Sequence, residues 1–340
     1  MGKTTIKDIA KECGVSLSTV SLVLNNNPRI SDKTRNRVLA SVRKHSYQPN
    51  AHARGLASQM SHSLSVVVPN LNHVFADIYF GEIVSGIYDH ATQQGYKLLL
   101  DIANEQFVKS EEYINLLKAR RADGMLFIAS SIEDEYLRVF EKSPYAFLLV
   151  NHYFPGSKLN YIAVDYKDSA RLAADHLTGF GHRAIGMIAG MNTYTGLDFR
   201  DAFIARCREK GLSERNVPWA PGGKDWSQEE GYEAARSLVE KNPNLTAIMA
   251  GNDRMAIGAM RYLHTRGLRI PEDVSVMGVD DISQASFTTP GLTTVRHNLY
   301  QLGKQACERM LALFRDEISE CRETLSSMLV VRESTGPAKR

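Results

Sequence analysis

The spacing of apolar positions at the start of the chain predicts three short helices. Apolar side chains recur with helical period in three sets: Ile6, Ile9 and Ala10; Val15, Val20 and Val23; and Val38, Leu39 and Val42. Residues of types that cap helices, Thr5, Ser16 and Ser31, stand where the three predicted helices begin. Gly14 stops the first helix, the second runs to about Leu24 before an Asn-rich turn with Pro28, and the third runs to about Lys44.

From residue 64 onward, continuous apolar runs alternate with amphipathic stretches. Eight runs have the character of buried strands: 64–69, 97–102, 124–129, 147–151, 161–165, 184–189, 246–251 and 274–279. Helical spacing lies between them, for example at 76–94, 166–180, 227–241 and 252–267. Buried strands separated by helices are typical of parallel sheets covered on both faces. Eight such units predict an α/β body of two doubly wound lobes, with ligands at the carboxyl ends of the strands.

Composition narrows the class of protein. The 340 residues are 43% hydrophobic and 23% charged, which is ordinary for a globular protein, and no apolar run approaches the roughly 20 residues of a membrane helix. The N-terminus lacks the apolar centre of a secretory signal, and Ile6 stands where a myristoylation signal has Ser or Thr. The four cysteines are scattered without metal-binding spacing. We expect a cytoplasmic protein with reduced cysteines, no metal and no cofactor.

The charge is distributed unevenly along the chain. Residues 1–60 contain ten Lys and Arg but only three Asp and Glu, a net charge of +7, so the remaining residues carry −4. A basic head on a mildly acidic body indicates nucleic-acid binding, although a solvated basic face would show the same charge.

The second predicted helix carries four hydroxyl side chains, Ser16, Ser18, Thr19 and Ser21, although such residues are poor to indifferent helix formers. Three short helices with a tight glycine-containing turn match the helix-turn-helix motif, whose second helix enters the major groove of DNA. Hydroxyls there can contact phosphates or base edges. The alternative is a small structural helical bundle, which would gain little from them.

Longer stretches of sequence resemble a known family. TIKDIAKECGVSLSTVS, ISDKTRNRVLASVRKHSYQPNAHARGLAS and, near the end, GVDDISQASFTTPGLTTV closely resemble the lactose/galactose-repressor (LacI/GalR) family of bacterial regulators. The resemblance implies that Leu17, Ser18 and Leu22 read bases. Many members carry Arg at the position of Leu22, and Leu cannot bond guanine in the same way, so the half-site should differ. The implied DNA-contacting set is Thr5, Ser16, Leu17, Ser18, Thr19, Ser21, Leu22, Asn25, Arg29, Ser31, Thr34, Asn50, Ala53, Arg54 and Leu56.

Residues 50–59 can form only a short helix that is marginal in water, and Gly55 weakens it further. Considered alone, the segment is a flexible linker. The resemblance implies instead a hinge helix that pairs with its copy in the DNA minor groove, where Leu56 wedges into a base step. Such a marginal segment can be ordered or released by small shifts of the domains that hold it.

Catalytic motifs are hard to find in the body. It has no Walker P-loop, no Gly-x-Ser-x-Gly and no His-Glu-x-x-His, and the glycines at 179–186 follow a helix and precede a strand, the reverse of a dinucleotide loop. Polar and aromatic residues instead collect near predicted strand ends: Ser130, Asp165, Asn252, Asp280, Arg200 at the start of the helix after 184–189, and Trp226 in a loop. Each could merely cap or pack a helix. Together they suit a polyhydroxylated ligand.

The resemblance also implies effector contacts and domain limits. The implied effector-binding positions are Tyr79, Phe80, Ser130, Asp165, Arg200, Trp226, Asn252, Asp280 and His297. It further implies a head at 1–48, a hinge at 49–61 and a two-lobed effector-binding and dimerisation body at 62–340, of periplasmic-binding-protein type. The first lobe is expected near 62–161 plus 292–322 and the second near 162–291 plus 323–340. Because the leucine-heptad tail of tetrameric members is missing, we expect a homodimer.

The sequence thus predicts a cytoplasmic, sequence-specific transcription regulator, most often a repressor. Its expected partners are a palindromic operator in double-stranded DNA, a second copy of itself and a small effector, expected to be a sugar or a sugar derivative. A carbohydrate-binding or carbohydrate-modifying protein with an accessory DNA-binding head remains an alternative. A non-specific architectural DNA binder would not require the two-lobed body.

Overall fold

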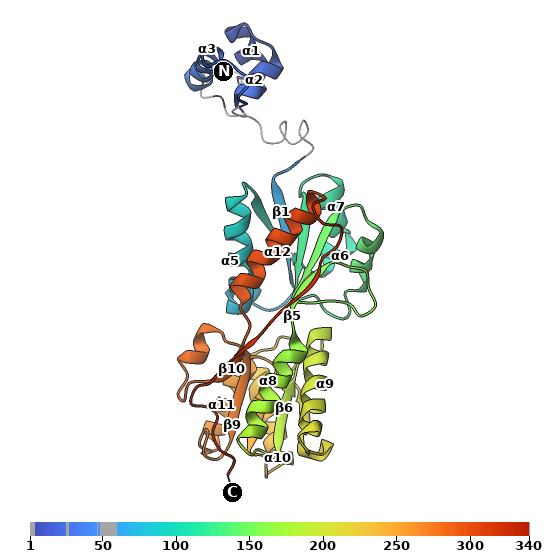
Figure 1. The fold of residues 1–340 in the computed structure, drawn as a ribbon, viewed down its shortest axis with the longest axis vertical. Helices are drawn as coiled ribbons and strands as arrows, with labels where there is room; N and C mark the ends of the chain where they lie inside the picture. Colours follow the sequence, from blue (N-terminus) through green and yellow to red (C-terminus); the bar gives the residue numbers. More distant parts are fainter. Residues whose placement is uncertain (1–3, 25–26, 46, 48–59, 340) are drawn as a thin grey trace. The chain divides into compact units, whose positions relative to one another are not determined.

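The computed structural model describes residues 4–24, 27–45, 47 and 60–339, and its contacts divide the chain into two units, residues 1–61 and 62–340. The first unit, the head, contains α1 (Ile6–Cys13), α2 (Leu17–Leu24) and α3 (Asp32–Lys44) (Figure 1). These are the three helices predicted from the spacing of apolar positions. Ile9, Val20, Val23 and Val38 are almost fully buried and form the centre of its small core.

The predicted capping residues stand at the starts of the head helices. The hydroxyl of Ser16 accepts a hydrogen bond from the backbone N–H of Thr19 at 3.1 Å, and Ser31 accepts one from Thr34 at 3.5 Å. These side chains satisfy backbone donors that a helix start leaves unpaired. Gly14 ends α1 with a φ of 59°, a left-handed conformation that glycine adopts without steric cost.

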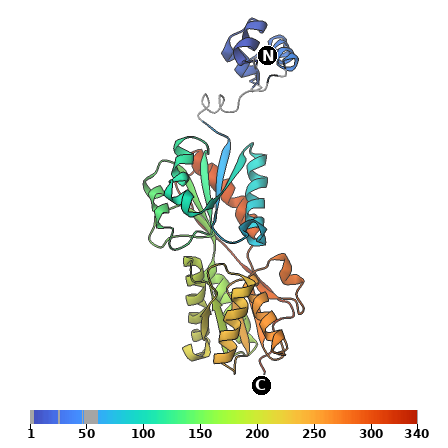
Figure 2. The ribbon, with the colours of Figure 1, turned by 180° about the vertical axis from the view of Figure 1, so that it is seen from behind.

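The second unit, the body, contains two six-stranded sheets. The first sheet is parallel, with the order β11-β5-β4-β3-β1-β2. Its strands are β1 (Ser63–Pro69), β2 (Lys97–Ala103), β3 (Gly124–Ile128), β4 (Ala146–Val150), β5 (Tyr161–Val164) and β11 (Arg322–Leu325). The helices of this lobe are η1 (Val74–Ala76), α5 (Ile78–Gln93), α6 (Glu105–Lys109), α7 (Glu112–Lys118), η2 (Glu135–Lys142) and α12 (Leu299–Phe314). Figures 1 and 2 show α5 and α12 side by side against the sheet.

The second sheet has the order β12-β10-β9-β8-β6-β7, and only β12 is antiparallel to its neighbour. Its strands are β6 (Ile185–Ala189), β7 (Trp219–Pro221), β8 (Ala247–Ala250), β9 (Ser275–Asp280), β10 (Thr293–Arg296) and β12 (Met328–Val330). The helices are α8 (Tyr166–Gly179), α9 (Tyr194–Glu209), η3 (Glu214–Asn216), α10 (Gln228–Lys241), α11 (Asp253–Thr265) and η4 (Ser283–Ser286). Separate hydrophobic clusters pack α8 with α9 and α10 with α11 around this sheet.

The two-lobed α/β fold is confirmed, but the predicted lobe limits are wrong by several residues. Strand β5 pairs entirely within the first sheet, so the chain crosses after residue 164 rather than 161. Strand β10 belongs to the second sheet, although 292–322 was expected in the first lobe, and β11 belongs to the first. The strands β7, β10, β11 and β12 were not predicted, because segments of three or four residues carry too little periodic pattern.

Glycines let two helix pairs approach closely. A Cβ atom on Gly86 of α5 would lie 2.0 Å from the carbonyl oxygen of Tyr300 in α12, and one on Gly303 would lie 2.0 Å from that of Ile83. In the second lobe, a Cβ atom on Gly258 of α11 would lie 1.9 Å from the Gln228 carbonyl oxygen of α10. Any side chain at these positions would force the helices apart.

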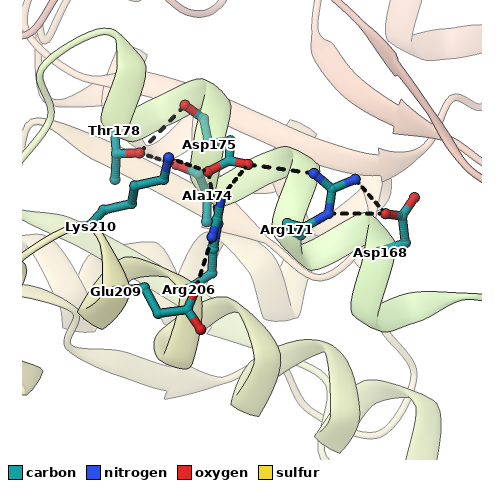
Figure 3. A network of polar contacts seen from close by, with 8 residues as sticks. All are labelled: Asp168, Arg171, Ala174, Asp175, Thr178, Arg206, Glu209 and Lys210. Atoms are coloured by element: carbon teal, nitrogen blue, oxygen red, sulfur yellow. Dashed lines mark hydrogen bonds and ion pairs between the residues drawn. The ribbon is translucent and has the colours of Figure 1, made fainter.

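A polar network centred on Asp175 joins α8 to α9 on the outside of the second lobe (Figure 3). The carboxylate accepts two hydrogen bonds from Arg206, at 2.9 and 3.0 Å, and forms an ion pair with Lys210 at 2.9 Å. Arg206 is the main reason that the pKa of Asp175 lies below its usual range. Because both contacts come from a neighbouring helix, the network supports the α8–α9 packing.

Within the part of the chain that the structure describes, none of the helices combines the length and apolar character needed to span a lipid bilayer. The four cysteines are buried and unpaired with one another.

Candidate functional site

Helix α2 presents apolar side chains to solvent on one of its faces. Val20 and Val23 are buried in the head core, whereas the side chains of Leu17 and Leu22 leave 44% and 37% of their surface exposed. Ser18 is also exposed. These are the three positions predicted to read bases. Exposed leucines gain nothing from water, so this face is suited to apolar contact, such as that with thymine methyl groups.

The hydroxyl groups at the start of α2 bond to one another. The Ser16 oxygen lies 2.7 Å from that of Ser18 and 2.9 Å from that of Thr19. Ser16, Ser18 and Leu17 are exposed, while Thr19 and Ser21 are half-buried. The cluster thus caps the helix and also presents polar atoms at its exposed N-terminus.

The other predicted DNA contacts lie elsewhere in the head or cannot be placed. Arg29 is exposed beyond α2, Thr5 precedes α1, and Ser31 with Thr34 forms the start of α3. The remaining predicted positions lie outside the described residues: Asn25, Asn50, Ala53, Arg54 and Leu56. The segment 50–59, predicted to form the hinge helix, also lies outside the described residues.

A cavity of about 340 Å³ lies between the two lobes of the body, at the carboxyl ends of their strands. This is where doubly wound sheets bind ligands. Five of the predicted effector contacts line it: Tyr79, Phe80, Trp226, Asn252 and Asp280. They come from the first turn of α5, the loop before α10, the cap of α11 and the end of β9. Tertiary structure thus brings together residues separated by up to about 200 positions in sequence.

Four predicted effector contacts do not line the cavity. Ser130 is fully buried behind its wall, and Asp165 caps α8 by accepting hydrogen bonds from the backbone N–H groups of residues 167 and 168. His297 lies behind Asp280. The fourth residue outside the lining is Arg200.

Arg200 does not begin its helix, as had been expected from the sequence. Helix α9 starts at Tyr194, because the hydroxyl of Thr193 caps it by accepting from the backbone N–H of Gly196 at 3.0 Å. Arg200 therefore lies in the second turn. It forms an ion pair with Asp201 at 2.7 Å, and its guanidinium lies over the ring of Trp219, 5.2 Å from the centroid.

Trp226 lies against two glycines of the second lobe. Its indole N–H donates to the side-chain oxygen of Asn192 at 2.6 Å. A Cβ atom on Gly190 would lie 1.8 Å from the indole, and one on Gly196 would lie 3.0 Å from it. The ring is thereby held in one orientation, with part of its surface lining the cavity.

Sequence reasoning missed several lining residues. The amide of Asn151, at the end of β4, donates to the hydroxyls of Tyr79 at 2.5 Å and Tyr166 at 2.8 Å. Asp77, the cap of α5, forms an ion pair with Arg254 of α11, so this contact bridges the lobes. The signal for Asn151 was present, because it ends a predicted strand. The Asp77–Arg254 contact joins residues far apart in sequence and had no local signal.

Asp280 is the most deeply buried carboxyl group of the cavity lining. It is 6% exposed and has a φ of 107°, a strained conformation for a residue other than glycine. Its Oδ1 lies 3.1 Å from Nδ1 of His297, whose Nε2 lies 3.0 Å from the Ser169 hydroxyl. Burial raises the pKa of Asp280 well above its ordinary value and lowers that of His297 to about 3. His297 is therefore neutral at physiological pH.

Comparison with known proteins agrees with this geometry. Residues 5–50 match the family described as "Bacterial regulatory proteins, lacI family", and residues 174–335 match a "Periplasmic binding protein-like domain". Catabolite control protein A of Priestia megaterium is 30% identical over 96% of this chain and 95% of its own length. The regulator GalR of Escherichia coli K12 is 32% identical over 97% of this chain and 95% of its own. The chain belongs to the LacI family.

Two solved structures match this chain along almost its whole length. A lac repressor dimer bound to operator and the anti-inducer ONPF has a TM-score of 0.87 and 26% identity, covering 98% of this chain and all of the other. A complex of the regulator CelR with cellobiose has a TM-score of 0.73 and 25% identity, covering 97% of this chain and 99% of the other. This LacI-family chain is therefore a DNA-binding transcriptional regulator with a ligand-binding type of body.

Proposed function

We propose that this protein is a homodimeric repressor whose affinity for a palindromic operator is set by a sugar or sugar derivative bound between the lobes. The observation that carries the proposal is the interlobe cavity. Its walls come from both lobes, and they combine aromatic rings with hydrogen-bonding groups. A ligand that contacts both walls favours one arrangement of the lobes over another, and it can shift an equilibrium only through that difference in affinity.

In this proposal the residues that contact the effector are Tyr79, Phe80, Asn151, Trp226, Asn252 and Asp280. Aromatic rings stack on the apolar face of a sugar ring, while amide and carboxyl groups bond its hydroxyls. The lac repressor structures with ONPF and ONPG and the CelR–cellobiose complex support a carbohydrate as the class of effector.

The effector is tested first by a thermal-shift screen of the full-length protein against a panel of sugars. A ligand that binds only the folded state raises the melting temperature. The sugar that does so is then added to the protein bound to operator DNA, and the change in affinity shows whether it is an inducer or a corepressor. A sugar that binds the cavity but leaves operator affinity unchanged contradicts the proposed coupling.

DNA recognition is proposed for the exposed face of α2, with Leu17, Ser18 and Leu22 at base edges and basic residues such as Arg29 at phosphates. A symmetric dimer pairs two heads with a palindrome, and phosphate contacts make the affinity strongly dependent on salt. Selection from random DNA should return a palindrome. Equal binding to that palindrome and to scrambled DNA at physiological salt would reject this assignment.

The hinge assignment belongs to the same proposal, with Leu56 as the side chain that wedges into the minor groove. Leu56→Ala should leave the body folded and able to bind its ligand while it weakens operator binding by a few kcal/mol, about the cost of unstacking a base step. Equal DNA bending and equal affinity of mutant and wild type would show that Leu56 is no wedge.

Homodimer formation is proposed from the lac repressor dimer and from the exposed apolar surface of the body. Phe287 is 86% exposed, and Tyr88 of α5 and Leu100 of the edge strand β2 leave about half of their surface exposed. A second copy could cover such side chains. Sedimentation at micromolar concentration should give the mass of a dimer, and Phe287→Lys should lower that mass.

The rival function is a carbohydrate-modifying protein with an accessory DNA-binding head. Incubation of the purified protein with the sugar found in the screen distinguishes the two, since a regulator returns it unchanged. The relatives are named as regulators, which favours regulation without turnover. Because its target is bacterial DNA, we place the protein in the cytoplasm, on the nucleoid when it is bound.

A further inference from the structure

We infer that the effector of this cavity carries no negative charge: it is an unphosphorylated polyhydroxylated ring, on which an amine strengthens binding and a phosphate prevents it. This rests on the proposed function and specifies its ligand class. The charged groups of the cavity lining carry the argument. Five are carboxyl groups, Asp77, Glu133, Asp134, Asp225 and Asp280, and two are cations, Lys224 and Arg254.

The cations are poorly placed to bind an anion. Arg254 is paired with Asp77 across the lobes, so it is not free to serve a ligand without losing that contact. Lys224 is exposed in the loop before Trp226, and it forms no ion pair with the described residues. This single ammonium can offset at most one of the carboxyl groups of the lining. The four carboxyl groups other than Asp77 therefore have little positive charge opposite them.

Carboxyl groups also gather at the deepest part of the lining. Asp280 is 6% exposed and Asp253 beside it is fully buried, and burial together with repulsion by Asp280 raises the pKa of Asp253 well above its ordinary value. Burial, and to a smaller extent repulsion by Asp77, likewise raises the pKa of Asp280. The side-chain partner of Asp280 is His297, which is neutral and supplies no compensating charge. A ligand seated here meets carboxyl oxygens and no positive charge.

Helix N-termini favour anions and therefore oppose this conclusion. Helices α5, α9 and α11 all begin at the cavity. Each start is already capped by a side chain of its own: Asp77 accepts from the N–H of residue 79, Thr193 from that of residue 196, and Asn252 from that of residue 255. The cap of α5 is a carboxylate, and α11 has Asp253 in its first turn. The positive ends of these three helices are thus largely satisfied. The carboxyl groups therefore determine the sign of the charge that a ligand meets in the cavity.

The affinity of this cavity for a ligand should therefore depend strongly on the charge of the ligand. A phosphate carries about −1.5 to −2 charges at pH 7 and would face uncompensated carboxyl groups where water is limited. An ammonium group would be attracted by the same residues, while a hydroxyl can donate to Asp280 in either protonation state.

The test uses the full-length protein and matched probes of one ring: glucose, glucosamine and glucose 6-phosphate, and the equivalent galactose series. Calorimetry should show, for the series that binds, phosphate affinity at least about tenfold below that of the neutral sugar, a difference of ~1.4 kcal/mol. The amine should bind more tightly than the neutral sugar, and an amine that binds more weakly overturns the inference. A 6-phosphate that binds best overturns the inference but leaves the proposed function intact. No binding by any probe overturns both the inference and the carbohydrate assignment.

A pair of charge reversals links the preference to the lining. Glu133 lines the cavity and is exposed, whereas Glu229 of α10 is exposed and does not line it. Glu133→Lys should raise the affinity ratio of phosphate to neutral probe by about threefold or more, since the new charge lies near the ligand. Glu229→Lys, with the same change of charge, should leave that ratio unchanged. Equal ratios in the two variants would overturn the electrostatic account.

Discussion

At the scale of single residues, the proposed contact between Leu22 and DNA bases can be tested directly by substitution. It is 37% exposed on α2, where replacement leaves the buried Val20 and Val23 in place. Leu22→Arg should therefore keep the head folded and shift the selected half-site toward guanine at one position. The expected preference is about 1–3 kcal/mol, the worth of a bidentate contact between arginine and guanine. Selection from random DNA with wild type and variant measures it.

The matched control adds the same charge elsewhere in the head. Asn36 is exposed on α3, so Asn36→Arg should raise general DNA affinity without altering the consensus. An unchanged consensus for Leu22→Arg would mean that this position does not face bases.

His152 is a buried residue for which the structure offers no hydrogen bond. It is completely buried, neither ring nitrogen has a partner, and Phe154 and Tyr194 lie beside it with ring centroids at 5.1 and 5.9 Å. Burial lowers its pKa to about 3. Between about pH 6.5 and pH 3 the unfolded chain therefore binds a proton that the folded protein does not, so His152 reduces stability as the pH falls.

His152→Phe should relieve this effect because the aromatic surroundings accept a ring without polar atoms. The gain in unfolding free energy over wild type should be about 2 kcal/mol larger at pH 5 than at pH 7, since one pKa unit is worth ~1.4 kcal/mol. Urea unfolding of both proteins at the two pH values measures the difference. His264→Gln, at an exposed site, should show no such change. A gain independent of pH would mean that His152 does not remain neutral.

At the scale of elements, the contact between α5 and α12 depends on glycine. Because a Cβ atom on Gly86 would overlap the backbone of Tyr300 and Lys304, Gly86→Ala must separate the two helices. We expect a loss of about 1–3 kcal/mol in the unfolding free energy, as for other overpacked sites. Chemical unfolding of the purified variant measures the loss.

Helix α5 supplies its own control. A Cβ atom on Gly81 would have no neighbour within 4 Å. Gly81→Ala should therefore leave stability unchanged or raise it by up to about 1 kcal/mol, because alanine is the better helix former. Equal losses for both variants would point to a general need for flexibility in α5 rather than to close packing.

The elements that could be predicted from sequence are those long enough to show a period. Strands such as β1 and β3 appeared as continuous apolar runs, and the head helices appeared with their caps. Strand β10 contains four residues and β12 contains three. Both pair with strands that are distant in sequence. Local pattern cannot assign such strands to a lobe, which is why the lobe limits were misplaced.

At the scale of the whole molecule, Trp226 should connect ligand binding to DNA binding. It lines the cavity but lies outside the head, so Trp226→Ala should bind operator DNA without ligand about as wild type does, if the effector is an inducer. Its response to the effector should be lost. If the effector is a corepressor, the variant should instead fail to be driven onto DNA. Titration of labelled operator with and without the effector measures both cases.

The chain's other tryptophan is the control. Trp219 is 45% exposed, does not line the cavity and contacts Arg200. Trp219→Ala should retain the ligand response, and it leaves Trp226 as the single tryptophan, whose emission should change when the effector binds. Loss of the response in both variants would place the effector site outside this cavity.

By itself the sequence determined the class of structure, because apolar period, capping residues and charge are local properties of the chain. It also pointed to Trp226, Asn252 and Asp280, and the family resemblance added Tyr79 and Phe80; the fold brings all five to one cavity. It could not exclude Ser130, Asp165, Arg200 and His297 from the lining, since orientation and burial depend on packing partners. Only the tertiary structure paired Asp77 with Arg254 and placed a neutral histidine behind Asp280. Such contacts, between groups far apart in the chain, set the charge that a ligand meets.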